Sequence, residues 1–224
     1  MNTILVVLNS RKQTWLLYNL LISFVTHTKY PERLKICINI DNDDVETQEF
    51  ANFAKSNINL NLIFESEERS FRLNDRINSS FNKYISDFNW ALNTDVCIRT
   101  ENWDSIIDEN NKENVLYIND DGEYGPGKQY CFFPILSKKI ISGMKTFFPT
   151  GIYNLGADVI LHQILDGFNI IKHIPISVWH YKYHNLIPHW IKTDSHFVND
   201  IYLDGNTFRI LKDRIRETLA DTNI

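Results

Sequence analysis

Three clusters of carboxylate, amide and basic side chains each follow a short apolar run in the first half of the sequence. They are Asn9 to Lys12, Asp41 to Asp44 and Asn93 to Asp95. The preceding runs are apolar on both sides, as is typical of buried parallel strands. Ligands of open parallel sheets bind beyond the carboxyl ends of the strands. We therefore expect the three clusters to lie along one edge of a sheet and to form a ligand-binding site.

The elements that must position these clusters alternate between strand and helix patterns. Strands are expected at Ile4–Leu8, Leu34–Ile40, Leu60–Phe64 and Trp90–Leu92, and helices at Trp15–Val25, Glu46–Lys55 and Phe71–Ile85. Such repetition implies right-handed crossovers. It predicts an α/β fold, Rossmann-like, with a mostly parallel central sheet flanked by helices on both faces.

The second half of the sequence is less regular. We expect a strand at Val115–Ile118, a Gly-rich loop at Asp120–Lys128, helices at Ile135–Met144 and Ala157–Leu165, strands at Asn169–Ile174 and Ile176–Trp179, and an amphipathic helix at Thr207–Leu219. No linker or repeat interrupts this order. We predict one domain over residues 1–184 and a helical C-terminal extension over residues 185–224 that packs on it.

Composition excludes several classes of protein. Among 224 residues, 13% are aromatic and only 8 are Gly and 6 are Pro, which excludes disordered and collagen-like chains. No apolar run approaches the roughly 20 residues of a membrane span. The net charge of -5 disfavours duplex nucleic acid as a partner. The 3 cysteines are far apart and expected to be free thiols, which indicates a reducing compartment and a cytoplasmic location, in a host cell if the protein is viral.

Four blocks of the sequence, in this order and spacing, resemble the nucleotide-sugar glycosyltransferases of the GT-A fold, and among them the inverting family 2. The blocks are Asn9-Ser10-Arg11 after the first strand, Ile40 to Asp44 after the second, Asn78 fifteen residues before Asn93-Thr94-Asp95, and Ala157-Asp158 nine residues before Gly167. Asn93-Thr94-Asp95 occupies the place of the family's Asp-x-Asp motif, and Ala157-Asp158 the place of its Glu-Asp.

The chain departs from the family pattern at two positions. Asn93 replaces the first Asp of the metal motif, and Ala157 replaces the Glu of the catalytic block. The second Asp of the motif commonly contacts the metal in this fold, so Asp95 is expected to suffice, with weaker metal binding. The missing Glu is expected to affect the acceptor contacts more than the base.

The resemblance implies a role for each acidic block. A divalent cation, Mn²⁺ or Mg²⁺, would neutralise the diphosphate leaving group through oxygen ligands. Asp95 is the expected ligand, and His180 is the candidate second ligand, with His184 as the alternative and Lys182 as a diphosphate contact. Asp158 is expected to act as the base that takes the proton of the acceptor hydroxyl.

The resemblance also assigns residues that hold the donor nucleotide. These are Asn9, Arg11, Asp41, Asn78 and Asn93. Assigned residues of the donor, catalytic and metal sites also have structural alternatives. Asp41 can cap the following helix, Asp158 can be a carboxylate that the helix dipole favours, and His180 can be a hydrogen-bonded strand residue.

The function that these assignments predict is metal-dependent transfer of a sugar, with inversion, from a nucleotide-sugar donor to an acceptor hydroxyl. UDP- or GDP-sugars are the first candidates for the donor, and a glycan, a protein or a modified nucleobase for the acceptor. A degenerate domain that binds the donor without turnover is one alternative. A sugar-1-phosphate nucleotidyltransferase is a weaker one, because it needs a Gly-rich loop after the first strand, where Asn9 to Lys12 has no Gly.

Overall fold

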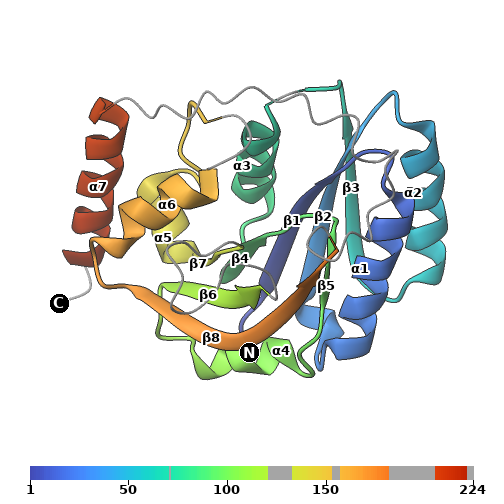
Figure 1. Ribbon diagram of the computed structural model, residues 1–224, viewed down its shortest axis with the longest axis horizontal. Helices are drawn as coiled ribbons and strands as arrows, with labels where there is room; N and C mark the ends of the chain where they lie inside the picture. Colours follow the sequence, from blue (N-terminus) through green and yellow to red (C-terminus); the bar gives the residue numbers. More distant parts are fainter. Residues whose placement is uncertain (71, 121–132, 153–156, 182–204, 221–224) are drawn as a thin grey trace.

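The computed structural model describes residues 1–70, 72–120, 133–152, 157–181 and 205–220 (Figure 1). The strands are β1 (Ile4–Ser10), β2 (Leu34–Asp41), β3 (Asn61–Glu67), β4 (Phe88–Ala91), β5 (Val96–Ile98), β6 (Val115–Asp120), β7 (Ile135–Ser137) and β8 (Ile171–His180). The helices are α1 (Thr14–His27), α2 (Val45–Asn57), α3 (Leu73–Tyr84), α4 (Trp103–Glu109), α5 (Lys138–Met144), α6 (Ala157–Asp166) and α7 (Gly205–Ala220), with a short 3₁₀ helix η1 (Pro31–Arg33) before β2.

The described strands form one sheet in the order β3-β2-β1-β4-β7-β6-β8-β5. The first four of these are parallel to one another, and β6 and β8 are also parallel. β7 runs antiparallel to both of its neighbours, and β5 runs antiparallel to β8. The chain moves outward from β1 to β3 and then returns to place β4 on the other side of β1. The strand order therefore reverses between β1 and β4, which is where ligands of doubly wound sheets bind.

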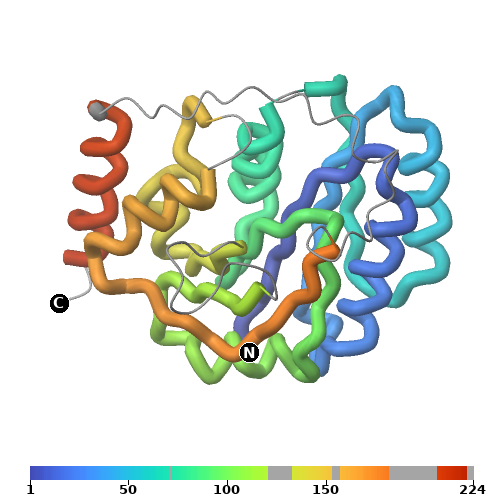
Figure 2. The backbone as a smooth tube through the Cα atoms, in the orientation of Figure 1, coloured from blue at the N-terminus to red at the C-terminus, as the bar shows by residue number. Residues whose placement is uncertain are grey.

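Helices cover both faces of the sheet, as predicted (Figures 1 and 2). Ile4, Val6 and Leu8 pack into a core cluster with α1, α2 and α4 on one face. Leu5 and Val7 pack into a second cluster with α3, α5, α6 and α7 on the other. Successive side chains of a strand point to opposite faces. The uninterrupted apolar run of β1 thus reflects burial on both sides.

The segment from Ile135 to Met144 differs from its prediction as one helix. Its first residues form strand β7, and the helix begins after Ser137, whose hydroxyl accepts a hydrogen bond from the Ile140 N–H at 3.4 Å. Ile135 and Leu136 pair with β4 on one side and β6 on the other. A short apolar run is compatible with either a buried strand or a helix. Pairing with β4 and β6 determines that this segment is a strand.

The two strands predicted around Pro175 are one strand, β8. It pairs with β6 on both sides of the proline, and the register shifts between Tyr117 and Asn119. Pro lacks the N–H that a sheet ladder needs, so its place within a strand is at such an irregularity. Two short elements, β5 and α4, were not predicted.

The predicted C-terminal helix, α7, packs against α5 and α6 (Figure 1). In the described part of the chain, no helix has both the length and the apolar composition to cross a bilayer.

Gly143 tests this packing. A Cβ built at Gly143 would lie 1.9 Å from the Thr218 hydroxyl oxygen of α7. We expect Gly143→Ala to force the two helices apart and to lower the free energy of unfolding by about 1–3 kcal/mol, the usual cost of overpacking. Urea denaturation would measure this. The exposed Ser142→Ala on the same helix is the matched control, with an expected change within about 0.5 kcal/mol. Equal stability of the two variants would contradict the close approach of α5 and α7.

Candidate active site

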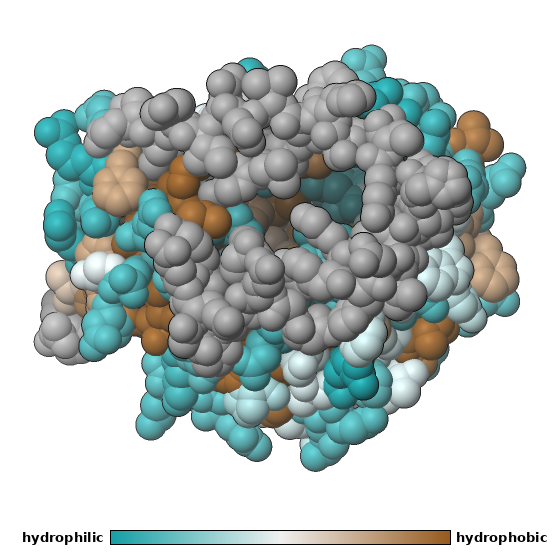
Figure 3. All heavy atoms as spheres, viewed as in Figure 1, coloured by the Kyte–Doolittle hydropathy of each residue, from teal (hydrophilic) through white to brown (hydrophobic). Residues whose placement is uncertain are grey.

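A cleft of about 140 Å³ opens at the carboxyl ends of β1 and β4, where the strand order reverses. Its lining consists of Asn9, Leu73, Asn74, Ile77, Ala91, Leu92, Asn93, Phe133, Pro134, Phe148, Ala157 and Asp158. Three of the predicted site residues, Asn9, Asn93 and Asp158, thus reach one cleft from three separate elements. Figure 3 shows the molecule hollowed over the middle of the face that Figure 1 presents.

Asp158 is in the first turn of α6, at the cleft wall. The apolar side of this helix, including Ile160, Leu161 and Ile164, is buried against the sheet and fixes its position. The carboxylate accepts a hydrogen bond from the Val159 N–H at 2.9 Å. Burial raises the pKa of Asp158 from 3.8 to about 6, because the charged form loses hydration. The carboxylate is therefore mostly ionised at pH 7 and is basic enough to accept a proton.

Asp95 and His180, the predicted metal ligands, are in contact. The His180 Nε2 lies 3.2 Å from the Asp95 Oδ2, and its Nδ1 lies 3.1 Å from the Asp120 Oδ2. The antiparallel pairing of β5 with β8 brings them together, because Val96 stands opposite His180 and the Tyr181 N–H donates to the Asp95 carbonyl oxygen at 2.9 Å. Burial opposes the charge of His180, but its hydrogen bonds to Asp120 and Asp95 raise its pKa to about 9.

The donor set around His180 fits a cation that is shared with a substrate. Asp95 and Asp120 occupy opposite ring nitrogens, so their carboxylates do not converge, and within the described residues no group of three potential metal ligands gathers. A hard cation in a phosphate-transfer site typically takes one or two protein ligands and completes its shell with phosphates and water. Asp95 and the Nε2 of His180 meet that requirement. Asp120 is suited to orient the ring from behind.

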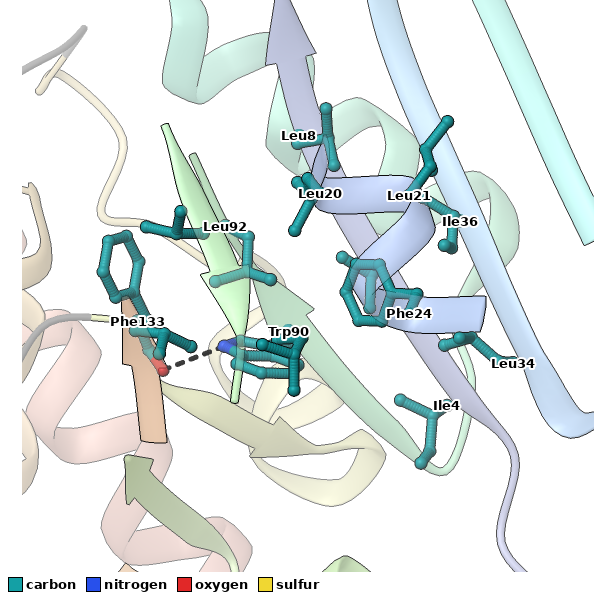
Figure 4. Packing of buried hydrophobic residues seen from close by; sticks show 14 of the residues in the cluster. Ile4, Leu8, Leu20, Leu21, Phe24, Leu34, Ile36, Trp90, Leu92 and Phe133 are labelled. Carbon is teal, nitrogen blue, oxygen red and sulfur yellow. Dashed lines mark hydrogen bonds between the residues drawn. The ribbon is translucent and has the colours of Figure 1, made fainter. Parts of the chain in front are cut away.

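Phe133 connects the predicted metal ligands to the cleft. Its ring lies edge-on to the His180 ring, with 5.7 Å between centroids, and it lines the cleft. The indole Nε1 of the fully buried Trp90 donates a hydrogen bond to the Phe133 carbonyl oxygen at 3.1 Å (Figure 4). Trp90 packs in the core with Phe24. The wall between the cleft and His180 is thus anchored in the core of the sheet.

Arg11 and Asp41, two of the predicted donor contacts, belong to a cluster of paired charges. The Arg11 guanidinium contacts Asp43 at 2.5 Å and Asp41 at 2.8 Å, and the hydrogen bonds to Asp43 and Asp41 raise its pKa. The other Asp41 oxygen accepts from Arg76 at 2.7 Å, and Arg76 lies 3.6 Å from Glu67. The positive charges of the two guanidinium groups are thus balanced by the negative charges of these carboxylates. The cluster therefore suits hydrogen-bonding groups, such as those of a nucleoside, better than a diphosphate.

Asn9 is held by a chain of buried polar side chains. Its amide oxygen accepts from Asn39 at 3.1 Å, and its amide nitrogen donates to the Leu73 carbonyl oxygen at 3.2 Å. The Asn39 oxygen in turn accepts from the Ser80 hydroxyl at 3.0 Å. Asn9 thus faces the cleft in an orientation that β2 and α3 determine.

Asn78 has a role within the fold. Its amide oxygen accepts from the N–H groups of Phe147 and Phe148, and its nitrogen donates to the Phe148 carbonyl oxygen at 3.0 Å. Asn78 does not appear in the lining of the cleft. Its predicted contact with the donor therefore gains no support from this geometry.

Several predicted features lie outside the described residues. They are His184, Lys182 and the Gly-rich loop after β6.

Sequence reasoning missed Asp120, which the structure places behind His180. The signal was present, because Asn119 and Asp120 follow a predicted strand just as the three recognised polar clusters do. It also missed Arg76, whose partner Asp41 was identified. Arg76 is buried in the helical segment around Asn78, where periodicity alone does not indicate which polar residue turns toward the sheet.

The sequence matches no protein-family model and no curated protein sequence. Solved structures do match it. The chain resembles S. aureus TarS over 97% of its length, with a TM-score of 0.64 and 15% identity, and spans 44% of that chain. It resembles the mannosyltransferase PcManGT from Pyrobaculum calidifontis, solved with GDP-Man and Mn²⁺, over 97% of its length (TM-score 0.60, 11% identity, 70% of that chain). It resembles GalNAc-T7, solved with UDP, GalNAc and Mn²⁺, over 80% (TM-score 0.64, 10% identity, 43% of that chain).

These likenesses define the fold. The chain has the GT-A fold of the nucleotide-sugar glycosyltransferases, and the prediction of that fold from the sequence is confirmed. At 10–16% identity, the match extends to the arrangement of the backbone.

Proposed function

We propose that this chain is a metal-dependent glycosyltransferase that moves a sugar from a nucleotide-sugar donor to an acceptor hydroxyl, with inversion at the anomeric carbon. The observation that carries the proposal is the meeting of Asp158 and Asn93 in one cleft, with Asp95 two residues further on and in contact with His180. A base and a cation site at one edge of the sheet are the two requirements of this reaction.

The donor is proposed to be a UDP- or GDP-sugar. S. aureus TarS 1–349 has been solved with UDP and with UDP-GlcNAc, and PcManGT with GDP-Man, on the same fold. In this chain the nucleoside would contact Arg11 and Asp41, whose charges are matched within the cluster. Asn9 and Asn93 would contact the part of the donor inside the cleft.

Asp95 and His180 would hold a divalent cation, Mn²⁺ or Mg²⁺. When bound, the cation supplies charge neutralisation for the diphosphate leaving group. Holding it at the Nε2 of His180 requires that nitrogen to be free of its proton. The Nδ1 hydrogen bond to Asp120 keeps the other proton in place and directs Nε2 toward Asp95.

Asp158 is the proposed base. It takes the proton of the acceptor hydroxyl as that oxygen bonds to the anomeric carbon, while the bond from this carbon to the diphosphate oxygen breaks and the nucleoside diphosphate leaves. A single displacement from the side opposite the leaving group inverts the anomeric centre. The raised pKa of Asp158, about 6, keeps it ionised at neutral pH and close to the range in which proton transfer is most effective.

A donor-hydrolysis screen tests the proposal. Common sugar nucleotides would be incubated with the protein and with Mn²⁺, Mg²⁺ or a chelator, and the released nucleoside diphosphate measured. We expect metal-dependent release from UDP- or GDP-sugars. Saturable donor binding without release, in the presence of varied acceptors, would favour the alternative of a binding domain, for which Asn93 and Ala157 give some reason. The absence of both binding and release would contradict the proposal.

Asp120 is proposed to orient His180, and its removal tests this. We expect Asp120→Asn to weaken Mn²⁺ binding in the presence of UDP by about 10- to 100-fold, the usual cost of losing a partner behind a metal ligand. Titration calorimetry would measure the dissociation constant. Since Asp120 acts through His180, adding Asp120→Asn to His180→Ala should cause no further loss. Additive losses, or an unchanged affinity in Asp120→Asn, would remove this role.

A further inference from the structure

A second cavity, of about 190 Å³, lies between the end of α5 and one face of α7. Its lining is Met144, Lys145, Thr146, Thr150, Thr207, Ile210, Leu211 and Arg214. None of these residues lines the cleft around Asp158. We refer to this cavity as the α5–α7 pocket. It has an apolar part, two cationic side chains and three threonines, of which Thr146 donates its hydroxyl proton to the Phe148 carbonyl oxygen at 2.7 Å.

The charges of the α5–α7 pocket are all of one sign. Its charged residues are Lys145 and Arg214, and no carboxylate is among the described residues that line it. Within the described part of the chain, neither of the two makes an ion pair, whereas Arg216 on the same helix is paired with Asp213 at 2.6 Å.

One of the two cations is held in place, and the other, Lys145, is exposed. Arg214 is half-buried, and its Nη1 donates to the Met144 carbonyl oxygen at 3.2 Å, which fixes the guanidinium at the end of α5. Lys145 ends α5 in the left-handed conformation, with a φ of 61°. Thr207 is in the first turn of α7, which contains no acidic residue. The pocket thus lies between the positive end of the α7 dipole and the negative end of the α5 dipole, where the Met144 carbonyl oxygen accepts from Arg214.

One segment borders both cavities. Thr146 and Thr150 line the α5–α7 pocket, and Phe148, between them in the sequence, lines the cleft. Asn78 binds the backbone of this segment at Phe148, and the Asn74 amide donates to the Ile152 carbonyl oxygen at 2.9 Å. The segment is therefore fixed against α3 and contributes lining residues to both cavities.

We propose that the α5–α7 pocket binds a compact anionic group, a phosphate or a carboxylate, carried by the acceptor substrate. Guanidinium, ammonium and hydroxyl groups are the donors that such anions select. The assignment to the acceptor rests on the proposed glycosyl transfer. The affinity for an anion rests on the pocket alone, and the two parts can be tested separately.

The first test uses inorganic phosphate and, in a parallel arm, acetate, with no donor or metal present. We expect saturable shifts of the Lys145, Thr146 and Thr207 amide signals in ¹H–¹⁵N spectra of the whole chain. The probe that binds more tightly, phosphate or acetate, identifies the anionic group that the pocket prefers. Lys145→Gln should weaken the binding about tenfold or more, as the loss of one charge-assisted hydrogen bond predicts. Arg209→Gln, an exposed cation on α7 outside the lining, is the control and should leave the affinity unchanged.

Arg214→Gln should have the same effect as Lys145→Gln, but it also removes the bond to Met144. If the Arg214→Gln variant does not fold, the anion affinity of the Lys145→Gln variant is the deciding measurement. The anion site is overturned if neither probe gives saturable shifts at these amides, or if Lys145→Gln binds as tightly as the unmodified chain.

The second test compares a phosphorylated or carboxylated acceptor with its neutral counterpart. We expect Lys145→Gln to raise the KM of the anionic acceptor about tenfold with unchanged kcat, and to leave the neutral acceptor unaffected. Equal KM values, with phosphate binding intact, would overturn the assignment to the acceptor. If no donor is turned over, the proposed function fails, whereas phosphate binding that is lost in Lys145→Gln still supports the anion site.

Discussion

Replacing Asp158 by Asn is expected to reduce the kcat of sugar transfer by about 10² to 10⁴-fold, the range for removal of a general base. Asn is nearly isosteric but does not accept a proton from the acceptor hydroxyl. Donor binding should be nearly unchanged, because the proposed nucleoside and cation contacts lie on other elements. Single-turnover kinetics and titration of UDP into the variant would measure the two quantities.

Asp166→Asn is the matched control for this experiment. Asp166 is an exposed carboxylate at the other end of α6, so its replacement removes the same charge from the same helix without reaching the cleft. Activity should then stay near that of the unmodified chain. If Asp158→Asn retained full transfer activity, Asp158 would not be the base.

The pH dependence of the same variant provides an independent readout. The native state holds the Asp158 proton more tightly than the unfolded chain, since burial raises its pKa from 3.8 to about 6. The stability that this group contributes is therefore complete below pH 3.8 and is lost as the pH rises through about 6. The difference corresponds to about 3 kcal/mol as an upper limit.

Asp158→Asn should consequently gain stability relative to the unmodified chain between pH 4 and pH 7, while the transfer rate of the unmodified chain falls below a pH of about 6. Thermal unfolding of both proteins across this range would show the first effect, and a pH–rate profile the second. A stability difference that is the same at both ends of the range would indicate that Asp158 is well hydrated.

Replacing Asp95 by Ala is expected to weaken metal-dependent UDP binding by a hundredfold or more. Loss of a partner behind a metal ligand costs about 10- to 100-fold, and loss of the carboxylate ligand itself should cost at least as much. With Asp95 absent, His180 would be the one remaining predicted ligand. Titration of UDP with and without Mn²⁺ would separate the metal-dependent part from the rest.

Two features make this measurement decisive. UDP binding in the presence of a chelator should be the same in Asp95→Ala and in the unmodified chain, since the Arg11 cluster is not altered. Asp213→Ala, which removes an exposed carboxylate on α7, should retain the full effect of Mn²⁺. An Asp95→Ala variant that binds UDP with unchanged, Mn²⁺-dependent affinity would remove Asp95 from the metal site.

The parts of the site that could be predicted are those that local sequence determines. Asn9 is within β1, next to its end at Ser10, and Asn93 lies two residues after β4; the alternation of strands and helices places such residues at one edge. Asp158 was predicted because Ala157-Asp158 opens a helix nine residues before Gly167, as the Glu-Asp block of the resembled family does. In each case a short window of sequence contains both the element and the residue at its end, so no knowledge of distant pairing is needed.

The remaining parts depend on pairing between distant strands. Asp120 and Asp95 meet the His180 ring from β6 and from the loop before β5, across 60 and 85 residues of sequence. Only the pairing of β8 with both strands brings them together. Asn78 illustrates the opposite case. Its spacing fits the family pattern, but its amide binds the backbone of Phe147 and Phe148, which the sequence does not indicate.

Anomalous X-ray scattering from crystals grown with UDP and MnCl₂ would locate the cation and the nucleotide together. We predict one strong Mn²⁺ peak within bonding distance of the Asp95 carboxylate and the His180 Nε2, with the UDP diphosphate between that peak and the cleft that contains Asp158. A Mn²⁺ peak elsewhere on the molecule, or UDP bound away from Asp95 and Asp158, would contradict this prediction.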